Sequence, residues 1–240
     1  MTRASDKHAT DVPTTDARAA TPRAQARIRG ISVPMLVPET GPVHVLLVGE
    51  APGPRGADKS GYPFFGDGAG QHLYTALVRL GAMSLPDALR SMPWDGARFA
   101  NAGLRPQPQG VALGNALDRC PTDNGMTFRT PTRAELENDL NLARLNADMS
   151  KLLKRDLRGV VTLGKVAART IDACLARYPL LAASLVRRAL PHPSAQGLLS
   201  MAPNRGKGAR LADLQEAWMQ QCQQAVLEAG YPAPSAENAS

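Results

Sequence analysis

Two short segments bring together residue types that could bind a ligand and act on it. An apolar run at 43–48 leads directly into Gly49-Glu50-Ala51-Pro52-Gly53, and Leu190-Pro191-His192-Pro193-Ser194 lies far along the chain. A buried parallel strand that ends in a glycine and proline turn presents backbone N–H groups and one carboxylate at its carboxyl end, where open α/β sheets bind ligands. His192, held between two prolines, could face this turn across a cleft.

The loop at 49–70 is unusually dense in glycine. Glycine lets the backbone approach a ligand closely. A loop-to-helix junction also concentrates unpaired N–H groups, which can hold an anion or a carbonyl-rich ring. The loop lacks the Gly-Lys-Ser/Thr ending of a phosphate-cradling loop and is not a dinucleotide fingerprint. A small-molecule nucleotide-binding module is therefore the least favoured class of function.

The elements that must position these segments alternate between strands and helices. Apolar runs predict strands at 43–48, 111–117 and 159–164, and a fourth strand that ends near residue 190. Apolar spacing predicts helices at 70–81, from Thr132 to about residue 157, at 165–177 and at 209–230. Thr132 and Glu135 have capping-box spacing, and Trp218 has the spacing of a core residue. This alternation predicts an α/β fold with a parallel, helix-covered sheet.

The composition fits one globular α/β domain. Hydrophobic residues make up 43% and charged residues 20% of the 240 residues. No apolar run approaches the roughly 20 residues that a transmembrane helix needs, and no hydrophobic signal segment opens the chain, so we expect a soluble, cytoplasmic protein. Residues 1–30 have no apolar period and predict a disordered basic arm, and residues 231–240 predict a flexible tail.

The charge balance favours a polyanionic partner. The 28 Lys and Arg residues outnumber the 21 Asp and Glu residues, which gives a formal charge of +7 that basic tails alone could produce. Basic residues also recur beside the candidate segments, at Arg119, Arg129, Arg133, Arg205, Lys207 and Arg210. Two interpretations stay open, a phosphate-facing patch and an ordinary solvated surface.

Three blocks in order carry a resemblance to a known family. They are Gly49-Glu50-Ala51-Pro52-Gly53, then Gly61-x-Pro63-Phe64-x-Gly66 followed by Ala69-Gly70, then His192-Pro193-Ser194. They resemble the uracil-DNA glycosylase superfamily, families four and five, over about residues 43 to 220. The loop from Gly56 to Asp67 is more similar to family five, and Glu50 to family four. The resemblance implies a single glycosylase domain at 31–230, with a three-layer α/β/α fold and a central, mostly parallel four-stranded sheet.

The resemblance also implies an activity. Hydrolysis of an N-glycosidic bond passes through a sugar cation and a departing uracil anion, so the site must stabilise charge on the base and position one water. His192 matches the histidine that hydrogen-bonds uracil O2, and Phe64 matches the aromatic residue on which the flipped base stacks. Backbone N–H groups at Gly49, Glu50 and Ala51 would hold the carbonyl edge of the base.

Two acidic residues could activate the water. Asp67 matches the family-five position with that role, and Glu50 matches the family-four motif. We favour Asp67, because it follows Phe64 in the same loop, and keep Glu50 as a supporting or alternative group.

Asn115 matches the asparagine that reads the Watson–Crick edge of uracil, as a base-flipping enzyme must do. It lies one residue further from Cys120 than the family pattern expects. A strand bulge or recruitment of Asp118 could compensate, and either could broaden specificity towards other deaminated bases.

The segment after His192 matches the minor-groove loop of the superfamily. It contains Ser194 and Gln196, with Leu198 or Leu199 as the candidate wedge that replaces the flipped nucleotide. Arg205, Lys207 and Arg210 would then meet phosphates, although a solvated surface accounts for each of them equally well.

The cysteines depart from the family pattern. Families four and five usually carry an iron–sulfur cluster on four cysteines, whereas this chain has three scattered cysteines and Asp139 where a partner cysteine is expected. We therefore predict no cluster, no other cofactor and no metal site.

The sequence thus predicts a monofunctional uracil-DNA glycosylase of base excision repair that acts as a monomer on uracil-containing DNA in the bacterial nucleoid. A glycosylase that also removes hypoxanthine or xanthine is the near alternative. A non-catalytic DNA-binding relative is the alternative from another class.

Overall fold

The computed structural model describes residues 27–233, apart from the side chains of residues 204 and 205. A four-stranded sheet forms its centre, with strands β1 (Val43–Gly49), β4 (Gly110–Asn115), β5 (Gly159–Leu163) and β6 (Val186–Leu190). The strand order is β4-β1-β5-β6, and every neighbouring pair is parallel. The predicted α/β class is confirmed, and the central sheet is parallel throughout.

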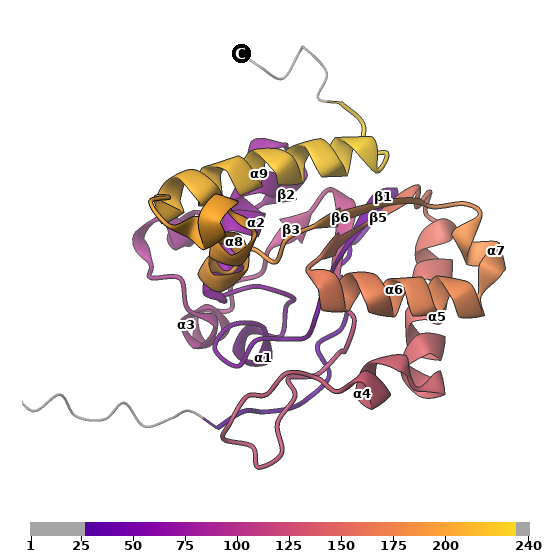
Figure 1. The fold of residues 1–240 in the computed structure, drawn as a ribbon, viewed down its shortest axis with the longest axis horizontal. Helices are drawn as coiled ribbons and strands as arrows, with labels where there is room; N and C mark the ends of the chain where they lie inside the picture. The colour runs from indigo at the N-terminus through magenta and orange to yellow at the C-terminus, as the bar shows by residue number, and fades with distance from the viewer. Residues whose placement is uncertain (1–26, 234–240) are drawn as a thin grey trace, which may run out of the picture.

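Helices cover both faces of this sheet (Figure 1). Helices α2 (Gly68–Arg79) and α9 (Leu211–Glu228) pack on one face, and α5 (Asp139–Leu153) and α6 (Lys165–Arg177) pack on the other. Along β1, Val45 and Leu47 contact the first layer, whereas Leu46 and Val48 contact the second. Because both faces are covered, β1 is apolar from Val45 to Val48 without alternation. The three-layer α/β/α architecture is therefore confirmed.

Short elements connect these layers. They are α1 (Ala57–Ser60), β2 (Met83–Ser84), η1 (Asp87–Ser91), α3 (Gly96–Asn101), β3 (Gln107–Pro108), α4 (Arg133–Glu137), α7 (Pro179–Ala182), α8 (Ala195–Met201) and η2 (Pro203–Gly206). Strands β2 and β3 pair as a separate antiparallel ribbon. Apart from the start of α4 at Thr132, the sequence predicts none of these elements, because two to seven residues are too few for a hydrophobic period to be recognised. No helix in the described part of the chain is both long and apolar enough to cross a membrane.

The single helix predicted from Thr132 to about residue 157 is wrong. The chain breaks at Asn138, which has φ −69° and ψ 156° and separates α4 from α5. The Asn138 side chain accepts a hydrogen bond from the Asn141 N–H and donates to the carbonyls of Ala134 and Glu135. Asparagine competes for backbone groups in this way and so favours a cap over a helix interior.

The start of α4 is fixed by the predicted capping box of Thr132 and Glu135, which is present. Arg129 makes a two-pronged contact with the Glu135 carboxylate and a third bond to Asp123, so the loop before α4 is attached to the start of that helix. This pairing with Arg129 lowers the pKa of Glu135 to about 2.

The second predicted strand, 111–117, ends at Asn115. The next two N–H groups, of Ala116 and Leu117, donate to the carbonyls of Gly49 and Glu50. The exit of β4 is thereby joined to the turn that follows β1. The predicted helix 70–81 begins at Gly68, and Gly81 has the φ of 75° expected of a glycine after a helix end.

Residues 1–26 of the arm predicted at 1–30 lie outside the described residues. Residues 234–240 of the tail predicted at 231–240 also lie outside them. At the end of the predicted arm, Ile28, Arg29 and Gly30 contact the folded domain. Ile28 is buried, and the N–H groups of Arg29 and Gly30 donate to the carboxylate of Asp58 at 2.9 and 2.8 Å. Asp58 is fully buried and also pairs with Lys59 at 2.9 Å.

Replacing Asp58 should loosen this segment. Asp58→Ala leaves two backbone N–H groups without their acceptor and removes the carboxylate partner of Lys59, and we expect it to lower the free energy of unfolding by about 3 kcal/mol. Asp87→Ala is the matched control, because the side chain of Asp87 is 89% exposed in its pair with Arg90. That control should change stability by less than about 0.5 kcal/mol. Urea unfolding measures both, and equal effects would contradict the role given to Asp58.

Candidate functional site

The carboxyl ends of the parallel strands meet at one edge of the sheet. Gly49 ends β1 and is paired with Asn115, which ends β4. Gly164 follows β5, and its N–H donates to the carbonyl of Leu190 at the end of β6, two residues before His192. The tertiary structure therefore brings Glu50, Asn115 and His192 to the same edge, as the sequence indicates.

The ring of Phe64 lies directly against Gly49. A Cβ atom on Gly49 would lie 2.4 Å from Cε1 of Phe64 and 3.0 Å from Oδ1 of Asn115. Phe64 has a φ of 62°, a conformation that costs a non-glycine residue about 1–3 kcal/mol. A Cβ atom on Gly70 would lie 1.8 Å from the carbonyl oxygen of Phe64. Glycine at both positions thus makes room for an aromatic side chain that is held in a strained conformation.

The side-chain amide of Asn115 is buried and unpaired. The residue is 3% exposed, and within the described residues neither Oδ1 nor Nδ2 has a hydrogen-bond partner. Each unpaired buried polar group costs about 1–3 kcal/mol. An amide in this state offers one donor and one acceptor beside the Phe64 ring. It can bind a flat ring whose edge carries a carbonyl next to an N–H.

His192 is oriented by its own loop. Its Nδ1 accepts a hydrogen bond from the Ser194 N–H at 3.2 Å, which places the proton of the neutral ring on Nε2. Burial lowers the pKa of His192 below its usual 6.5, so the ring is neutral at pH 7. Gly164, with φ 94°, lets the Cβ of His192 approach the end of β5. His192 therefore presents an N–H donor and no charge.

Trp218 supports the same loop from α9. It is 1% exposed, as its predicted core position requires, and its Nε1 donates to the carbonyl of Pro191 at 2.9 Å. Sequence reasoning found the core position of Trp218 and missed this hydrogen bond, because apolar spacing carries no information about where an indole N–H points.

The carboxylate of Asp67 is held by the loop after β1. The N–H groups of Gly56 and Ala57 donate to its two oxygens at 2.9 and 3.2 Å. Burial raises the pKa of Asp67, and these backbone N–H groups oppose the increase. A Cβ atom on Gly53 would lie 2.3 Å from Oδ1 of Asp67. The indole of Trp94, which sequence reasoning missed, donates to the Asp67 carbonyl at 2.7 Å.

Glu50 is the second carboxylate at this edge. It is half-buried, and burial raises its pKa while the charge of Arg169 on α6 lowers it. Over residues 27–233 its carboxylate makes no hydrogen bond, in contrast to that of Asp67. The edge therefore holds one tethered and one untethered carboxylate.

Comparison with known proteins places this arrangement in a family. A model of the uracil DNA glycosylase superfamily matches residues 38–220, which contain every residue of the edge described above. The chain belongs to the uracil DNA glycosylase superfamily. A Type-5 uracil-DNA glycosylase of Thermus thermophilus is 32% identical over 136 residues, which are 57% of this chain and 51% of the relative. The match thus spans about half of the relative's length.

The two candidate wedge residues after His192 differ in burial. Leu198 is 6% exposed and belongs to the core layer with α9. Leu199 is half-buried beside Gly206, and Gln196 is exposed. The Ser194 hydroxyl accepts from the Gly197 N–H at 3.1 Å and caps α8.

The basic residues divide into paired and unpaired groups. Arg119 pairs with Asp118, and Arg133 pairs with Glu137. Arg129 pairs with both Asp123 and Glu135. Lys207 and Arg210 are exposed and form no ion pair within residues 27–233, and the Arg205 side chain lies outside the described residues. The connection from α8 to α9 thus carries two basic side chains without an ion-pair partner among the described residues.

The cysteines do not fit an iron–sulfur cluster. Cys174 lies in the layer of α5 and α6, and Cys222 lies in the layer of α2 and α9, on the opposite face of the sheet. Burial raises the pKa of Cys120 and Cys222 to about 12 and that of Cys174 to about 11, so these groups are thiols rather than thiolates. Within the described residues, no three His, Cys, Asp or Glu side chains converge as metal ligands would.

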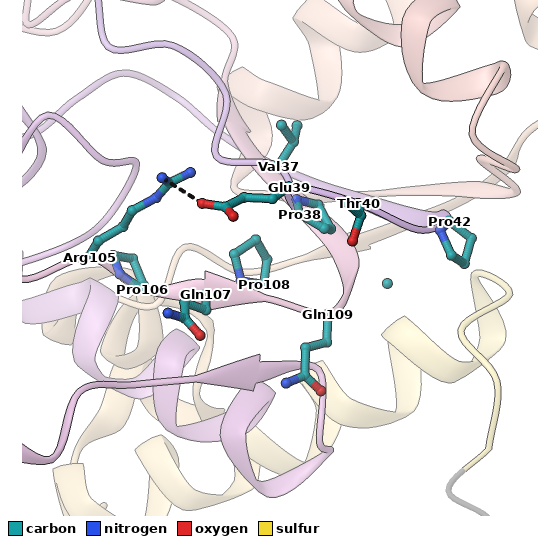
Figure 2. A pocket seen from close by; sticks show the side chains of 11 residues that line it. Val37, Pro38, Glu39, Thr40, Pro42, Arg105, Pro106, Gln107, Pro108 and Gln109 are labelled. Carbon is teal, nitrogen blue, oxygen red and sulfur yellow. Dashed lines mark hydrogen bonds and ion pairs between the residues drawn. The ribbon is translucent and has the colours of Figure 1, made fainter.

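A cavity of about 390 Å³ lies at the opposite end of the strands (Figure 2). It is lined by Val37, Pro38, Glu39, Thr40, Pro42, Arg105, Pro106, Gln107, Pro108, Gln109 and Gly110. Arg105 pairs with Glu39 across it at 3.0 Å. Because Gly110 begins β4, this cavity is separate from the edge that holds Asn115 and His192.

The contact at Gly49 can be tested by adding one methyl group. We expect Gly49→Ala to lower the free energy of unfolding by about 1–3 kcal/mol, because the new Cβ atom overlaps the Phe64 ring. Gly68→Ala is the control, since nothing lies within 4 Å of a Cβ atom there. It should leave stability unchanged or raise it by up to about 1 kcal/mol. Urea unfolding distinguishes the two, and a neutral Gly49→Ala would rule out the close contact.

Proposed function

We propose that this protein is a monofunctional uracil-DNA glycosylase, which flips uracil out of DNA and hydrolyses its bond to deoxyribose to leave an abasic site for base excision repair. The buried, unpaired amide of Asn115 beside the Phe64 ring is the observation that carries the proposal. Membership of the superfamily and similarity to a Type-5 uracil-DNA glycosylase support it.

Asn115 and Phe64 would recognise the flipped base. Uracil stacks on Phe64, its O4 accepts from Nδ2 of Asn115, and its N3–H donates to Oδ1. Cytosine presents the reverse order of donor and acceptor along this edge, so a fixed amide disfavours it. Backbone N–H groups at Gly49, Glu50 and Ala51 assist at the carbonyl edge of the ring.

His192 would stabilise the leaving group. As the glycosidic bond lengthens, negative charge develops on uracil O2, and the Nε2–H of the neutral ring donates to it. A donor that is already oriented needs no reorganisation as the charge develops. Two hydrogen bonds provide that orientation, one from the Ser194 N–H to the ring and one from the Trp218 indole to the Pro191 carbonyl.

We propose that Asp67 activates the attacking water and that Glu50 supports it. A catalytic group must be held in place, and Asp67 is tethered by two backbone N–H groups while Glu50 is not. Each carboxylate oxygen can accept a second hydrogen bond, so the tethered group can still orient a water. Water is the only nucleophile needed, and no lysine takes part.

DNA would lie along the connection from α8 to α9. Lys207 and Arg210 contact phosphates, joined in the proposal by Arg205, while Ser194 and Gln196 lie at the minor groove. Leu199 is the remaining leucine for the wedge position, because Leu198 is part of the core. The protein acts as a monomer on DNA of the bacterial nucleoid.

A wider substrate range is a second candidate. The Watson–Crick edge of hypoxanthine carries a carbonyl beside an N–H, as uracil does, so the Asn115 amide complements both bases. A panel of oligonucleotides that contain uracil, hypoxanthine or xanthine separates the narrow from the wide activity.

The decisive assay is incubation with uracil-containing DNA, followed by alkali cleavage at abasic sites. We expect the wild type to produce alkali-labile sites and His192→Ala to be about 100- to 1000-fold slower, because it lacks the donor to the uracil oxygen. His44→Ala is the control, since His44 pairs with Asp156 at the amino end of β1. DNA binding without abasic product over every lesion would instead identify a non-catalytic relative.

Replacing the two carboxylates separates catalysis from loop structure. Asp67→Asn should slow single-turnover excision about 100-fold and also lower the midpoint of thermal unfolding, because an amide cannot accept from both Gly56 and Ala57 as the carboxylate does. Glu50→Gln should slow excision less and leave the thermal midpoint unchanged. If Asp67→Asn keeps full single-turnover excision while Glu50→Gln abolishes it, the two assignments are reversed.

A further inference from the structure

A second buried amide and an arginine lie on α5 behind Asn115. Nη2 of Arg144 donates to the carbonyls of Asn115 and Ala116 at 3.3 and 2.8 Å, and to Oδ1 of Asn141 at 2.9 Å. The Nδ2 of Asn141 donates to the carbonyls of Ala116 and Leu136 at 2.9 and 2.7 Å. The amide of Asn141 is therefore fully paired, whereas that of Asn115 is not.

The position of β4 in the sheet explains why these side chains are needed. β4 is an edge strand, so Asn115 has a neighbouring strand, β1, on one side only. On the other side, the chain before β1 bridges β4 at Leu113 and not at the strand end. Carbonyls buried beyond that point need partners from side chains. Arg144 and Asn141 supply those partners, and the backbone of Asn115 is thus held from both sides.

We propose that Arg144 is a positioning residue, which acts with Asn141 to hold Asn115 in the orientation that reads the base. This inference rests on the proposed function of the site and deepens it. Arg144 does not touch the base and contacts only the backbone of the residue that reads it. A guanidinium suits this position, because its planar fork lets Nη2 reach two carbonyls while Nε reaches the amide oxygen of Asn141.

Asn115 needs positioning because its side-chain amide can present two different edges to a base. A side-chain amide rotated by 180° exchanges its donor and acceptor and would favour cytosine. Discrimination therefore depends on a fixed backbone and a fixed side chain. A displacement of about 1 Å at a positioned group slows a reaction by about 100-fold.

A double-mutant cycle tests the coupling. Single-turnover uracil excision is measured for the wild type, Arg144→Met, Asn115→Ala and the double variant. We expect Arg144→Met to slow excision about 10- to 100-fold. The factor by which Asn115→Ala slows excision should be about tenfold smaller in the Arg144→Met background than in the wild type. Arg144→Lys should restore part of the rate. Additive effects, or full excision by Arg144→Met, would overturn the proposal.

Arg177→Met is the matched control, because Arg177 makes an exposed pair with Asp139 and, within residues 27–233, forms no hydrogen bond to Asn115 or Ala116. It should leave both excision and the coupling unchanged. If Arg144→Met is too unstable to purify, the cycle is run with Arg144→Lys, which keeps the charge and loses the fork.

A measurement that needs no activity keeps the two proposals apart. In protein labelled with ¹⁵N at asparagine, the side-chain amide signals of Asn115 should shift or broaden in Arg144→Met and stay in place in Arg177→Met. Unchanged Asn115 signals in Arg144→Met would overturn the role of Arg144. If the wild type excises no deaminated base while these signals do shift, the proposed function fails and the hold of Arg144 on Asn115 stands.

Discussion

The contact between Gly49 and the Phe64 ring is the constraint on which the rest of the site depends. Because β1 ends without a side chain, the ring can lie against its backbone and beside Oδ1 of Asn115. That position requires the positive φ of Phe64 and the absence of a Cβ atom at Gly70, in the first turn of α2. Four glycines of this loop, Gly49, Gly53, Gly56 and Gly70, thus make room for two side chains, Phe64 and Asp67.

The site combines unfavourable local features with a well-packed frame. Phe64 is conformationally strained and the Asn115 amide is unpaired, and each feature costs about 1–3 kcal/mol. They persist because the sheet and its two helical layers fix the surrounding backbone. The side chains of Asn141 and Arg144 lie on the neighbouring helix α5, and in contrast to the Asn115 amide they form hydrogen bonds. Among these three polar side chains, the amide of Asn115 alone lacks a hydrogen-bond partner within residues 27–233.

The sequence by itself determined the long elements and the motif positions. Apolar runs and helical spacing predict β1, β5, α6 and α9 closely, because each is long enough for its period to be recognised. Strand ends marked by glycine and proline also predict that Glu50 and His192 face each other at one edge, and the resemblance to a known family adds Asn115. The break at Asn138 was missed because a hydrophobic period continues across it, and only the side-chain bonds of Asn138 separate the two helices.

Tertiary structure decided how individual side chains are used. It places Leu198 in the core, tethers Asp67 and not Glu50, and brings Arg144 behind Asn115 from a helix 29 residues further along the chain. Such contacts depend on which groups remain unpaired once the layers have assembled. The sequence can therefore name the residues of the site, while the environment that gives each residue its chemistry exists only in the folded chain.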